Sequence, residues 1–323
     1  AQAIPAEFLQ PCLLALRELV AHYRCTVVLC TATQPALDDT NLKRLQLPET
    51  KEIVDDPDQL FAELKRVRVE FIGKLTNDQL ARQLDGHPQV LCVVSTKKQA
   101  QQAVAIMRES EGTFHLSTNM YPVHRLRVLG VIRQRLADGL PCRVVSTSLV
   151  EAGVDLDFPV VYRAMAGLDS IAQAAGRCNR EGRADFGLLY VYEPEELPAM
   201  PWLRRRISRA QETLRLFPSG GCLELVPMQR YFELLYDVES LDAKDIVKRV
   251  NPCLHPELIV PFEEVAKGFR LIEDEGVGVI MPGLLEDRDE VQRLVEQLRH
   301  VQFPHAIGRK LQGYTVVVRS KVL

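Results

Sequence analysis

The strongest chemical signature in the chain is a glutamine, a glycine and two arginines between positions 173 and 180. The stretch ends an apolar helical segment and reads Gln173-Ala174-Ala175-Gly176-Arg177-Cys178-Asn179-Arg180. The spacing of three predicts that both guanidinium groups lie on one side of the helix. Two planar guanidinium forks aimed at one point suit a triphosphate, because they stabilise the charge that develops on the γ-phosphoryl group. The alternative is a solvated basic helix end.

A second polar stretch follows the apolar run Val144-Val145, where Ser146-Thr147-Ser148 opens into Glu151 and then Gly153-x-Asp155. Short hydroxyl side chains and backbone N–H groups at the carboxyl end of a strand are positioned to bind phosphates. Asp155 could accept a hydrogen bond from a ribose hydroxyl, or it could cap the next turn. The residues alone leave both roles open.

These polar stretches need a scaffold, and residues 88 to 193 predict one. Apolar strand runs alternate there with helical segments, which indicates an α/β fold with a mostly parallel sheet. The predicted strands are Val90–Ser95, Thr113–Leu116, Arg143–Ser146, Val160–Arg163 and Leu188–Tyr192. A helix is predicted from Pro122 to Asp138, since proline suits a first helical turn and Gly139 suits the left-handed residue after the end.

The flanking segments predict further elements. We expect a helix that ends near His22, with either a kink or its start near Pro11, and then a strand covered on both faces at Thr26–Cys30. A mainly helical appendage is predicted after Pro201, with helices at Trp202–Phe217 and Met228–Tyr236. A small α+β piece closes the chain, with strands at Val277–Met281 and Tyr314–Val318 and a helix at Glu290–Leu298.

Composition excludes several classes of protein. The formal net charge of -3 argues against a protein that coats nucleic acid through bulk basicity. The eight cysteines form no Cys-x-x-Cys pair and do not sit at ligand spacing from a histidine pair, so we expect reduced thiols and no metal site. No apolar stretch approaches the roughly 20 residues that span a bilayer, and we expect a cytoplasmic protein without a membrane partner.

The order of these stretches resembles the superfamily 2 helicases. Gly153-x-Asp155, followed after a strand by Gln-x-x-Gly-Arg-x-x-Arg at 173–180, is similar to their motifs V and VI. Thr31-Ala32-Thr33 resembles motif III, which couples the nucleotide state to the grip on nucleic acid. Ala1-Gln2 resembles the end of the Asp-Glu-Ala-Gln box of motif II. The resemblance implies a RecA-like sheet with helices on both faces.

More narrowly, the chain resembles the CRISPR-associated helicase-nucleases of type I systems. The stretches that carry this resemblance are Leu116–Arg125, Ala175–Arg180, Tyr231–Asp242 and Ala266–Asp274. Ala174 departs from the family, where many members have an arginine. The implied activity is that of an ATP-dependent single-strand DNA translocase, recruited by a CRISPR surveillance complex with its guide RNA to unwind and degrade invading DNA.

The resemblance also implies roles for single residues. Arg177 and Arg180 would be arginine fingers that Gln173 orients, while Asp155, Gly153 and Gly176 would lie at the nucleotide. The implied contacts to the sugar-phosphate backbone of one DNA strand are Ser95, Thr96, Ser117, Thr118, Thr147 and Ser148. For any one of these hydroxyls a helix N-cap is the alternative. Thr31, Ala32 and Thr33 would couple the two sites.

The implied cofactors are ATP and Mg²⁺, bound mainly by a first lobe. No Gly-x-x-x-x-Gly-Lys-[Ser/Thr] loop occurs in the 323 residues, so we expect the chain alone to be inactive. The family's nuclease metal is held by a domain that has no counterpart here. One alternative is a split, non-catalytic subunit that binds DNA or docks on the complex. Another is a superfamily 2 helicase acting on RNA or repair DNA, which the long region after residue 200 disfavours.

The predicted domains follow from these boundaries. They are the tail of a first RecA-like lobe (1–38), a connector (39–65), the second RecA-like lobe (66–200), a helical accessory region (201–254) and a small α+β domain (255–323).

Overall fold

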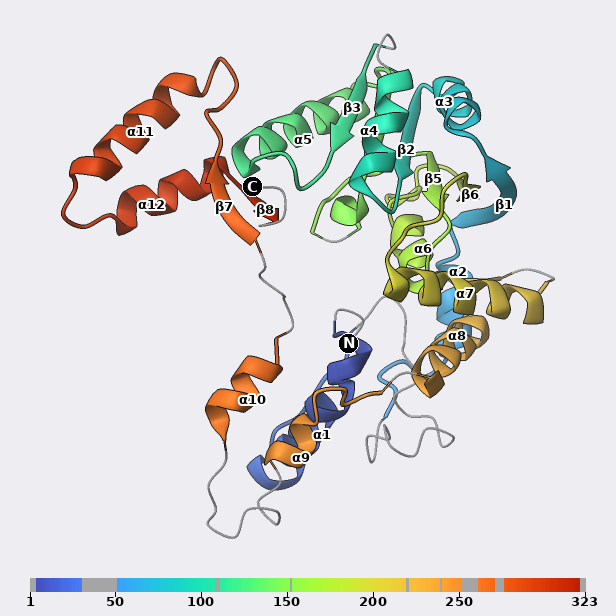
Figure 1. The fold of residues 1–323 in the computed structure, drawn as a ribbon. Helices are drawn as coiled ribbons and strands as arrows, with labels where there is room; N and C mark the ends of the chain where they lie inside the picture. The colour runs from blue at the N-terminus through green and yellow to red at the C-terminus, as the bar shows by residue number, and fades with distance from the viewer. Residues whose placement is uncertain are drawn as a thin grey trace. The chain divides into compact units, whose positions relative to one another are not determined.

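The computed structural model describes residues 4–30, 51–107, 111–151, 153–218, 221–238, 240–250, 261–270 and 276–319. The chain forms two compact units, each built from several segments (Figure 1). Unit 1 comprises Ala1–Lys65, Met165–Gln173 and Leu197–Glu273, and unit 2 comprises Arg66–Ala164, Ala174–Glu196 and Asp274–Leu323. The five-part division predicted from the sequence stays a prediction.

Unit 2 is built on a six-stranded parallel sheet with the strand order β1-β6-β5-β2-β4-β3. Its strands are β1 (Val67–Leu75), β2 (Gln89–Val93), β3 (Thr113–Leu116), β4 (Cys142–Ser146), β5 (Val160–Ala164) and β6 (Gly187–Pro194). The predicted α/β fold and five predicted strands are confirmed within a residue or two. β1 was not predicted, because its sequence mixes charged and apolar residues. That mixture suits its place at the end of the strand order, where, among the described strands, it pairs with β6 alone.

The helices of unit 2 begin with recognisable capping signals. They are α3 (Asn77–Asp85), α4 (Lys97–Ile106), α5 (Pro122–Ala137), α11 (Arg288–His300) and α12 (His305–Leu311). Thr76 and Thr96 each form a capping box with the glutamine three residues on, which satisfies two free N–H groups at each start. The predicted helix from Pro122 is confirmed, and Gly139 adopts the expected left-handed conformation at φ 68°.

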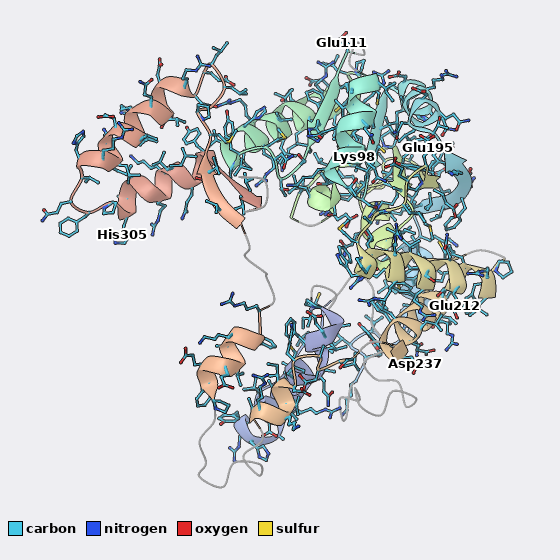
Figure 2. The ribbon with its side chains drawn as sticks, viewed as in Figure 1. Lys98, Glu111, Glu195, Glu212, Asp237 and His305 are labelled. Carbon is cyan, nitrogen blue, oxygen red and sulfur yellow. The ribbon has the colours of Figure 1, made fainter. Side chains whose placement is uncertain are left out.

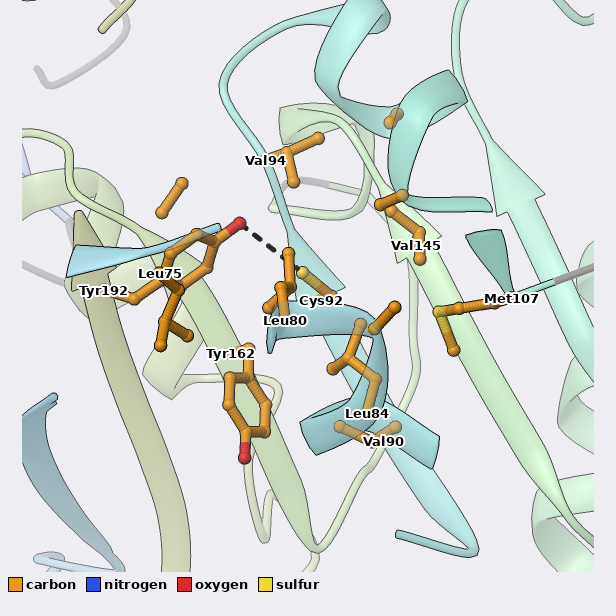
Figure 3. Packing of buried hydrophobic residues seen from close by; sticks show 14 residues of the cluster. Leu75, Leu80, Leu84, Val90, Cys92, Val94, Met107, Val145, Tyr162 and Tyr192 are labelled. Atoms are coloured by element: carbon orange, nitrogen blue, oxygen red, sulfur yellow. Dashed lines mark hydrogen bonds between the residues drawn. The ribbon is translucent and has the colours of Figure 1, made fainter. Parts of the chain in front are cut away.

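One hydrophobic cluster of unit 2 lies on one face of the sheet (Figure 3). Cys92 of β2 is fully buried, and its sulfur lies 3.9 Å from the hydroxyl of Tyr192 on β6. Leu80 and Leu84 of α3 and Met107 after α4 pack against the same strands. Each fully buried aliphatic side chain contributes roughly 1.5–3 kcal/mol. This packing fixes the helices that start at the carboxyl ends of the strands.

The last segment of unit 2 is the predicted α+β piece. β7 (Gly276–Ile280) pairs antiparallel with β8 (Thr315–Arg319), and α11 and α12 pack beside them. Its apolar cluster includes Tyr121, which directly precedes α5. The Tyr121 hydroxyl donates to Asp287 Oδ2 at 2.6 Å, and Arg127 Nη2 donates to Asp287 Oδ1 at 2.8 Å. The C-terminal piece is therefore tied to α5.

Unit 1 is helical in its described residues. Its elements are η1 (Ala6–Phe8), α1 (Leu9–Tyr23), α2 (Pro57–Glu63), α7 (Pro201–Leu216), α8 (Leu225–Val238), α9 (Ile246–Val250) and α10 (Phe262–Gly268). α7 and α8 lie against each other, as do α1 and α9 (Figure 1). The predicted N-terminal helix and the two helices after Pro201 are confirmed.

The strand predicted at Thr26–Cys30 is wrong. Residues 24–30 form no regular element, and Val28 and Leu29 are 65% and 41% exposed. A run of β-favouring residues becomes a strand only where another strand supplies hydrogen bonds and a covering face. Among the described residues, no strand pairs with this run.

α6 (Leu168–Ala175) contains the boundary between the units, since residues 168–173 belong to unit 1 and residues 174–175 to unit 2. The polar segment that carries Arg177 and Arg180 follows this helix directly.

Candidate functional site

Three pairs of hydroxyl residues meet at one edge of the sheet of unit 2. They follow β2, β3 and β4, which are neighbours in the sheet and run parallel. The ladder continues to the strand ends, because the Val94 N–H donates to Ser146 O at 2.8 Å and the Thr147 N–H donates to Leu116 O at 3.2 Å. The residues brought together are Ser95, Thr96, Ser117, Thr118, Thr147 and Ser148. We call these six residues the hydroxyl edge.

The members of the hydroxyl edge differ in exposure. Thr118 and Ser148 are exposed, whereas Ser117 is fully buried and Thr147 is 9% exposed. Thr96 Oγ1 accepts the N–H of Gln99 at 3.1 Å and so caps α4, which is the alternative that the sequence left open. The exposed hydroxyls are therefore the ones most open to a ligand.

Lysines stand beside this edge at the start of α4. Lys97 Nζ donates to Asn119 Oδ1 at 2.6 Å and so joins the loops that follow β2 and β3. Lys98, labelled in Figure 2, lies one residue further along α4. Its ammonium pairs with Glu196 at 3.1 Å. The side chains of this second pair are 67% and 78% exposed, so water screens it.

Arg177 and Arg180 are not on a helix, and the prediction that both lie on one helix side is wrong. α6 ends at Ala175, and Cys178 then forms a parallel bridge with Phe158. The Phe158 N–H donates to Arg177 O at 3.0 Å, and the Asn179 N–H donates to Phe158 O at 2.9 Å. These sheet-like bonds replace the helical ones, so the two arginines do not share a helix face.

Arg177 points into unit 2 and is 8% exposed. Its Nε donates to Val150 O and its Nη2 donates to Glu151 O, both at 2.8 Å. Burial lowers the pKa of Arg177, and the neighbouring charge of Arg180 lowers it further. This guanidinium holds the loop that follows β4.

Arg180 points outward. Its Nε lies 2.9 Å from Asp155 Oδ1, and the two side chains are 45% and 77% exposed. The Arg180 N–H donates to Asp157 Oδ1 at 2.6 Å, which anchors the backbone of this arginine. The sequence suggested a ribose contact or a turn cap for Asp155, and neither role included the pair with Arg180. Asp157 was not singled out from the sequence. The Arg180 pair is open to exchange with a ligand.

The remaining predicted site residues are less informative. Gly153 is exposed with φ 72°, a conformation that favours glycine. Gly176 is exposed in the turn after α6, and Gln173 is partly buried on α6. Thr31, Ala32 and Thr33 lie outside the described residues, as do Ala1 and Gln2.

Sequence reasoning also missed a buried ion pair. Arg163 at the end of β5 is 2% exposed, and its Nη2 lies 3.1 Å from Glu151 Oε1. A usable signal existed, since an arginine at the end of a buried apolar strand run requires a charged partner.

The chemistry of this site fits an anion. The donors around the loop from 147 to 157 are guanidinium groups, hydroxyls and backbone N–H groups, which suit phosphate oxygens. The carboxylates of Asp155 and Asp157 are held by Arg180 and its N–H. In the described part of the chain, no group of three or more His, Cys, Asp or Glu residues could hold a metal ion. No described helix is long and apolar enough to cross a membrane.

Residues 86–183 match a family model described as "CRISPR-associated nuclease/helicase Cas3, C-terminal". Two curated relatives carry the name CRISPR-associated nuclease/helicase Cas3. The protein from Haloferax volcanii is 42% identical over 65 residues, which are 20% of this chain and 7% of the relative. The protein from Methanothermobacter thermautotrophicus is 27% identical over 112 residues, which are 34% of this chain and 14% of the relative.

Solved structures agree on the fold. Cas3 of T. fusca with ATP has a TM-score of 0.51 at 18% identity, and the match covers 79% of this chain and 36% of that one. A chain of a CRISPR RNA-guided surveillance complex in the pre-nicking state has a TM-score of 0.50 at 17% identity, with 79% and 37% covered. This chain therefore spans well under half of these relatives.

The motif order, the parallel six-stranded sheet and these matches agree. Residues 86–183 therefore resemble the C-terminal region of Cas3 nuclease/helicases, and the fold is like that of the matched Cas3 structures.

Proposed function

We propose that this chain is part of an ATP-dependent single-strand DNA translocase that acts with a CRISPR surveillance complex in the cytoplasm to unwind and degrade invading DNA. The observation that carries the proposal is one loop with two functional ends. Residues 147–157 begin with Thr147 and Ser148 of the hydroxyl edge and carry near their other end Asp155, which pairs with Arg180. A loop of this kind can transmit a change at a nucleotide to a DNA strand.

At the nucleotide end, Arg180 would act as the arginine finger. Its guanidinium is about half exposed, so a γ-phosphate could displace the Asp155 carboxylate without exposing a buried charge. Asp155, once released, could then accept a hydrogen bond from the ribose. Arg177 would hold the loop rather than touch the phosphate, because its Nε and Nη2 both donate to backbone carbonyls. Gln173, Gly153 and Gly176 remain proposed parts of this site.

ATP with its Mg²⁺ would supply the free energy of hydrolysis for each step along the strand. The residues that cradle its phosphates and hold the metal would lie outside these 323 residues, since no P-loop sequence occurs among them. The nuclease metal would likewise be held elsewhere. Thr31, Ala32 and Thr33 remain proposed coupling residues.

At the DNA end, the hydroxyl edge would contact the sugar-phosphate backbone of one strand. Thr118 and Ser148 are exposed and can donate to phosphate oxygens, while Lys97 and Lys98 add positive charge nearby. Such contacts position a strand without reading its sequence. Binding should therefore depend on salt and be nearly independent of base composition.

The test of this proposal uses the complete protein that carries this chain. We expect ATP hydrolysis stimulated by single-stranded DNA, and a fall of about 10³-fold or more in kcat for Arg180→Ala, the range found when an arginine finger is removed. Arg183→Ala is the matched control, because Arg183 is also exposed and paired, with Glu181, but lies outside the helicase motif. Full turnover in Arg180→Ala would exclude the arginine-finger role. DNA binding without any turnover would instead indicate a non-catalytic docking subunit.

A second experiment tests the hydroxyl edge. The double variant Thr118→Ala/Ser148→Ala should weaken binding of the isolated chain to oligothymidylate and to mixed-sequence single strands by the same factor. Ser208→Ala is the control, since Ser208 is an exposed serine on α7. Unchanged affinity of the double variant would place the DNA elsewhere.

A further inference from the structure

Arg163 occupies an unusual position for a charged residue. It is the second-to-last residue of β5, which lies between β6 and β2 inside the sheet, and it is 2% exposed. Its Nη1 donates to Val93 O at 3.2 Å and to Ala164 O at 3.1 Å, so it bonds to the ends of two neighbouring strands. Its Nη2 pairs with Glu151 Oε1 at 3.1 Å, and the two side chains are 3% and 9% exposed.

Such a pair is a poor way to stabilise a sheet. Taking each ion out of water costs several kcal/mol, and well-packed apolar residues at such a site are often as stabilising or more so. What a hydrogen-bonded buried pair does provide is a fixed geometry between the segments that carry its partners. The segments here are the end of β5 and the loop after β4.

Arg163 also reaches the hydroxyl edge. Its Nη1 lies 3.4 Å from Ser95 Oγ. Because a guanidinium has donors only, this contact makes the Ser95 oxygen an acceptor and turns the hydroxyl hydrogen away from Arg163. The hydrogen is then available to an outside acceptor such as a phosphate oxygen, and the nearby positive charge strengthens it as a donor.

Glu151 is shared between two arginines. Its carboxylate pairs with Arg163, while its backbone carbonyl accepts from Arg177 Nη2 at 2.8 Å. Arg177 belongs to the segment that ends in Arg180. An unbroken series of contacts therefore runs from Ser95 through Arg163 and Glu151 to Arg177.

We propose that Arg163 and Glu151 are positioning residues that transmit occupation of the hydroxyl edge by a nucleic-acid backbone to the Arg177–Arg180 segment. The inference rests on the proposed function and deepens it. A phosphate that binds Ser95 strengthens the Ser95–Arg163 contact, which draws the Arg163 guanidinium toward the edge. Glu151 follows its partner, and Arg177 follows the Glu151 carbonyl.

The variant that isolates this series is Glu151→Gln, which keeps the shape of the side chain and removes its charge. The matched control is Glu181→Gln, because Glu181 is an exposed partner of Arg183 and takes no part in the series. Hydrogen–deuterium exchange of the 323-residue chain, with and without an oligothymidylate, measures the hydroxyl edge and the Arg177–Arg180 segment in one experiment.

In the wild type and in Glu181→Gln, the oligonucleotide should slow exchange at residues 95–99 and also at residues 176–181. In Glu151→Gln it should still slow exchange at 95–99, but the effect at 176–181 should be lost. Arg163→Lys, which keeps the charge but not the planar fork, should retain part of the effect. A merely structural role would speed exchange at both places with or without DNA.

The outcomes separate the two proposals. Protection transmitted to 176–181 in Glu151→Gln would overturn the series while leaving DNA binding intact. Absence of binding by the folded wild-type chain would overturn the proposed function and this inference with it. Should Glu151→Gln fail to fold, Ser95→Ala serves instead, and undiminished protection at 176–181 in that variant would likewise overturn the inference.

Discussion

Two arginine–carboxylate pairs hold the loop from residue 147 to residue 157, and they differ in burial. Arg163 and Glu151 pair at 3.1 Å with side chains 3% and 9% exposed. Arg180 and Asp155 pair at 2.9 Å with side chains 45% and 77% exposed. The distances are nearly equal, so surroundings and not separation distinguish the two pairs.

The surroundings decide what each pair can do. Unit charges 3 Å apart attract by about 1.4 kcal/mol in bulk water and by about 5.5 kcal/mol at an effective dielectric constant of 20. The buried pair is therefore difficult to break and fixes the loop to the sheet. The exposed pair breaks easily, so its arginine is free to take another anion. A single loop is thus fixed at Glu151 by the buried pair and can release its contact at Asp155 when another anion binds Arg180.

The largest expected effect comes from breaking the buried pair. Glu151→Ala leaves the Arg163 guanidinium buried without its carboxylate, and such changes cost about 3–5 kcal/mol. Native-state hydrogen exchange of β2 and β4 amides gives the free energy of opening for this part of the sheet. A loss below about 1 kcal/mol would show that water reaches Arg163 and that the two pairs are alike.

Arg177→Ala should have the next largest effect. It removes two charge-assisted hydrogen bonds, to Val150 O and Glu151 O, and each is worth about 1.5–3 kcal/mol. We expect limited proteolysis to become faster within residues 148–157. Arg177→Lys should restore only part of the resistance, because an ammonium cannot reproduce the fork. Equal resistance of wild type and Arg177→Ala would mean that Arg177 does not hold the loop.

The pH dependence of stability tests whether water is excluded from the buried segment around Cys178, next to Arg177. Burial raises the pKa of the Cys178 thiol to about 12. The pKa of this thiol is higher in the folded chain than in the unfolded chain, where it is about 8.5. Its contribution to the free energy of unfolding is therefore complete below about pH 8.5 and is lost as the pH rises toward the folded pKa. The slope is about 1.4 kcal/mol per pH unit for one proton.

Urea unfolding between pH 8 and 10.5 measures this loss. Cys178→Ala should show a shallower decline than the wild type, whereas Cys25→Ala, which changes an exposed thiol, should match the wild type. Parallel curves for wild type and Cys178→Ala would contradict the raised pKa.

The smallest expected effect on stability comes from the exposed pair. Asp155→Ala should change the free energy of unfolding by less than about 1 kcal/mol, and added salt should remove the difference. In the complete protein the same variant should raise the KM for ATP, if Asp155 touches the ribose as proposed. A destabilisation as large as that of Glu151→Ala would remove the contrast between the two pairs.

The sequence predicted the scaffold well because the scaffold depends on local patterns. Continuous apolar runs marked five strands of the sheet, and proline and Gly139 marked the two ends of α5. The six residues of the hydroxyl edge were named through the family resemblance, and the strand order β2-β4-β3 brings the ends of their strands together. β1 was not predicted from the sequence, because a strand at the edge of a sheet need not be apolar on both faces.

Long-range pairing decided the rest. Thr26–Cys30 has the composition of a strand but no partner strand among the described residues, and β-propensity alone forms none. Arg177 and Arg180 would share a face only if α6 continued, and the bridge between Cys178 and Phe158 ends the helical geometry before they are reached.

The sequence by itself thus determined the fold class, the strand ends and the residue types that can bind phosphate. Only the tertiary structure decided that Arg177 is buried on backbone carbonyls, that Arg180 is exposed beside Asp155, and that Arg163 joins Glu151. The physical reason is that spacing along the chain sets local periodicity, whereas the burial and partner of a charge depend on which segments the folded sheet brings together.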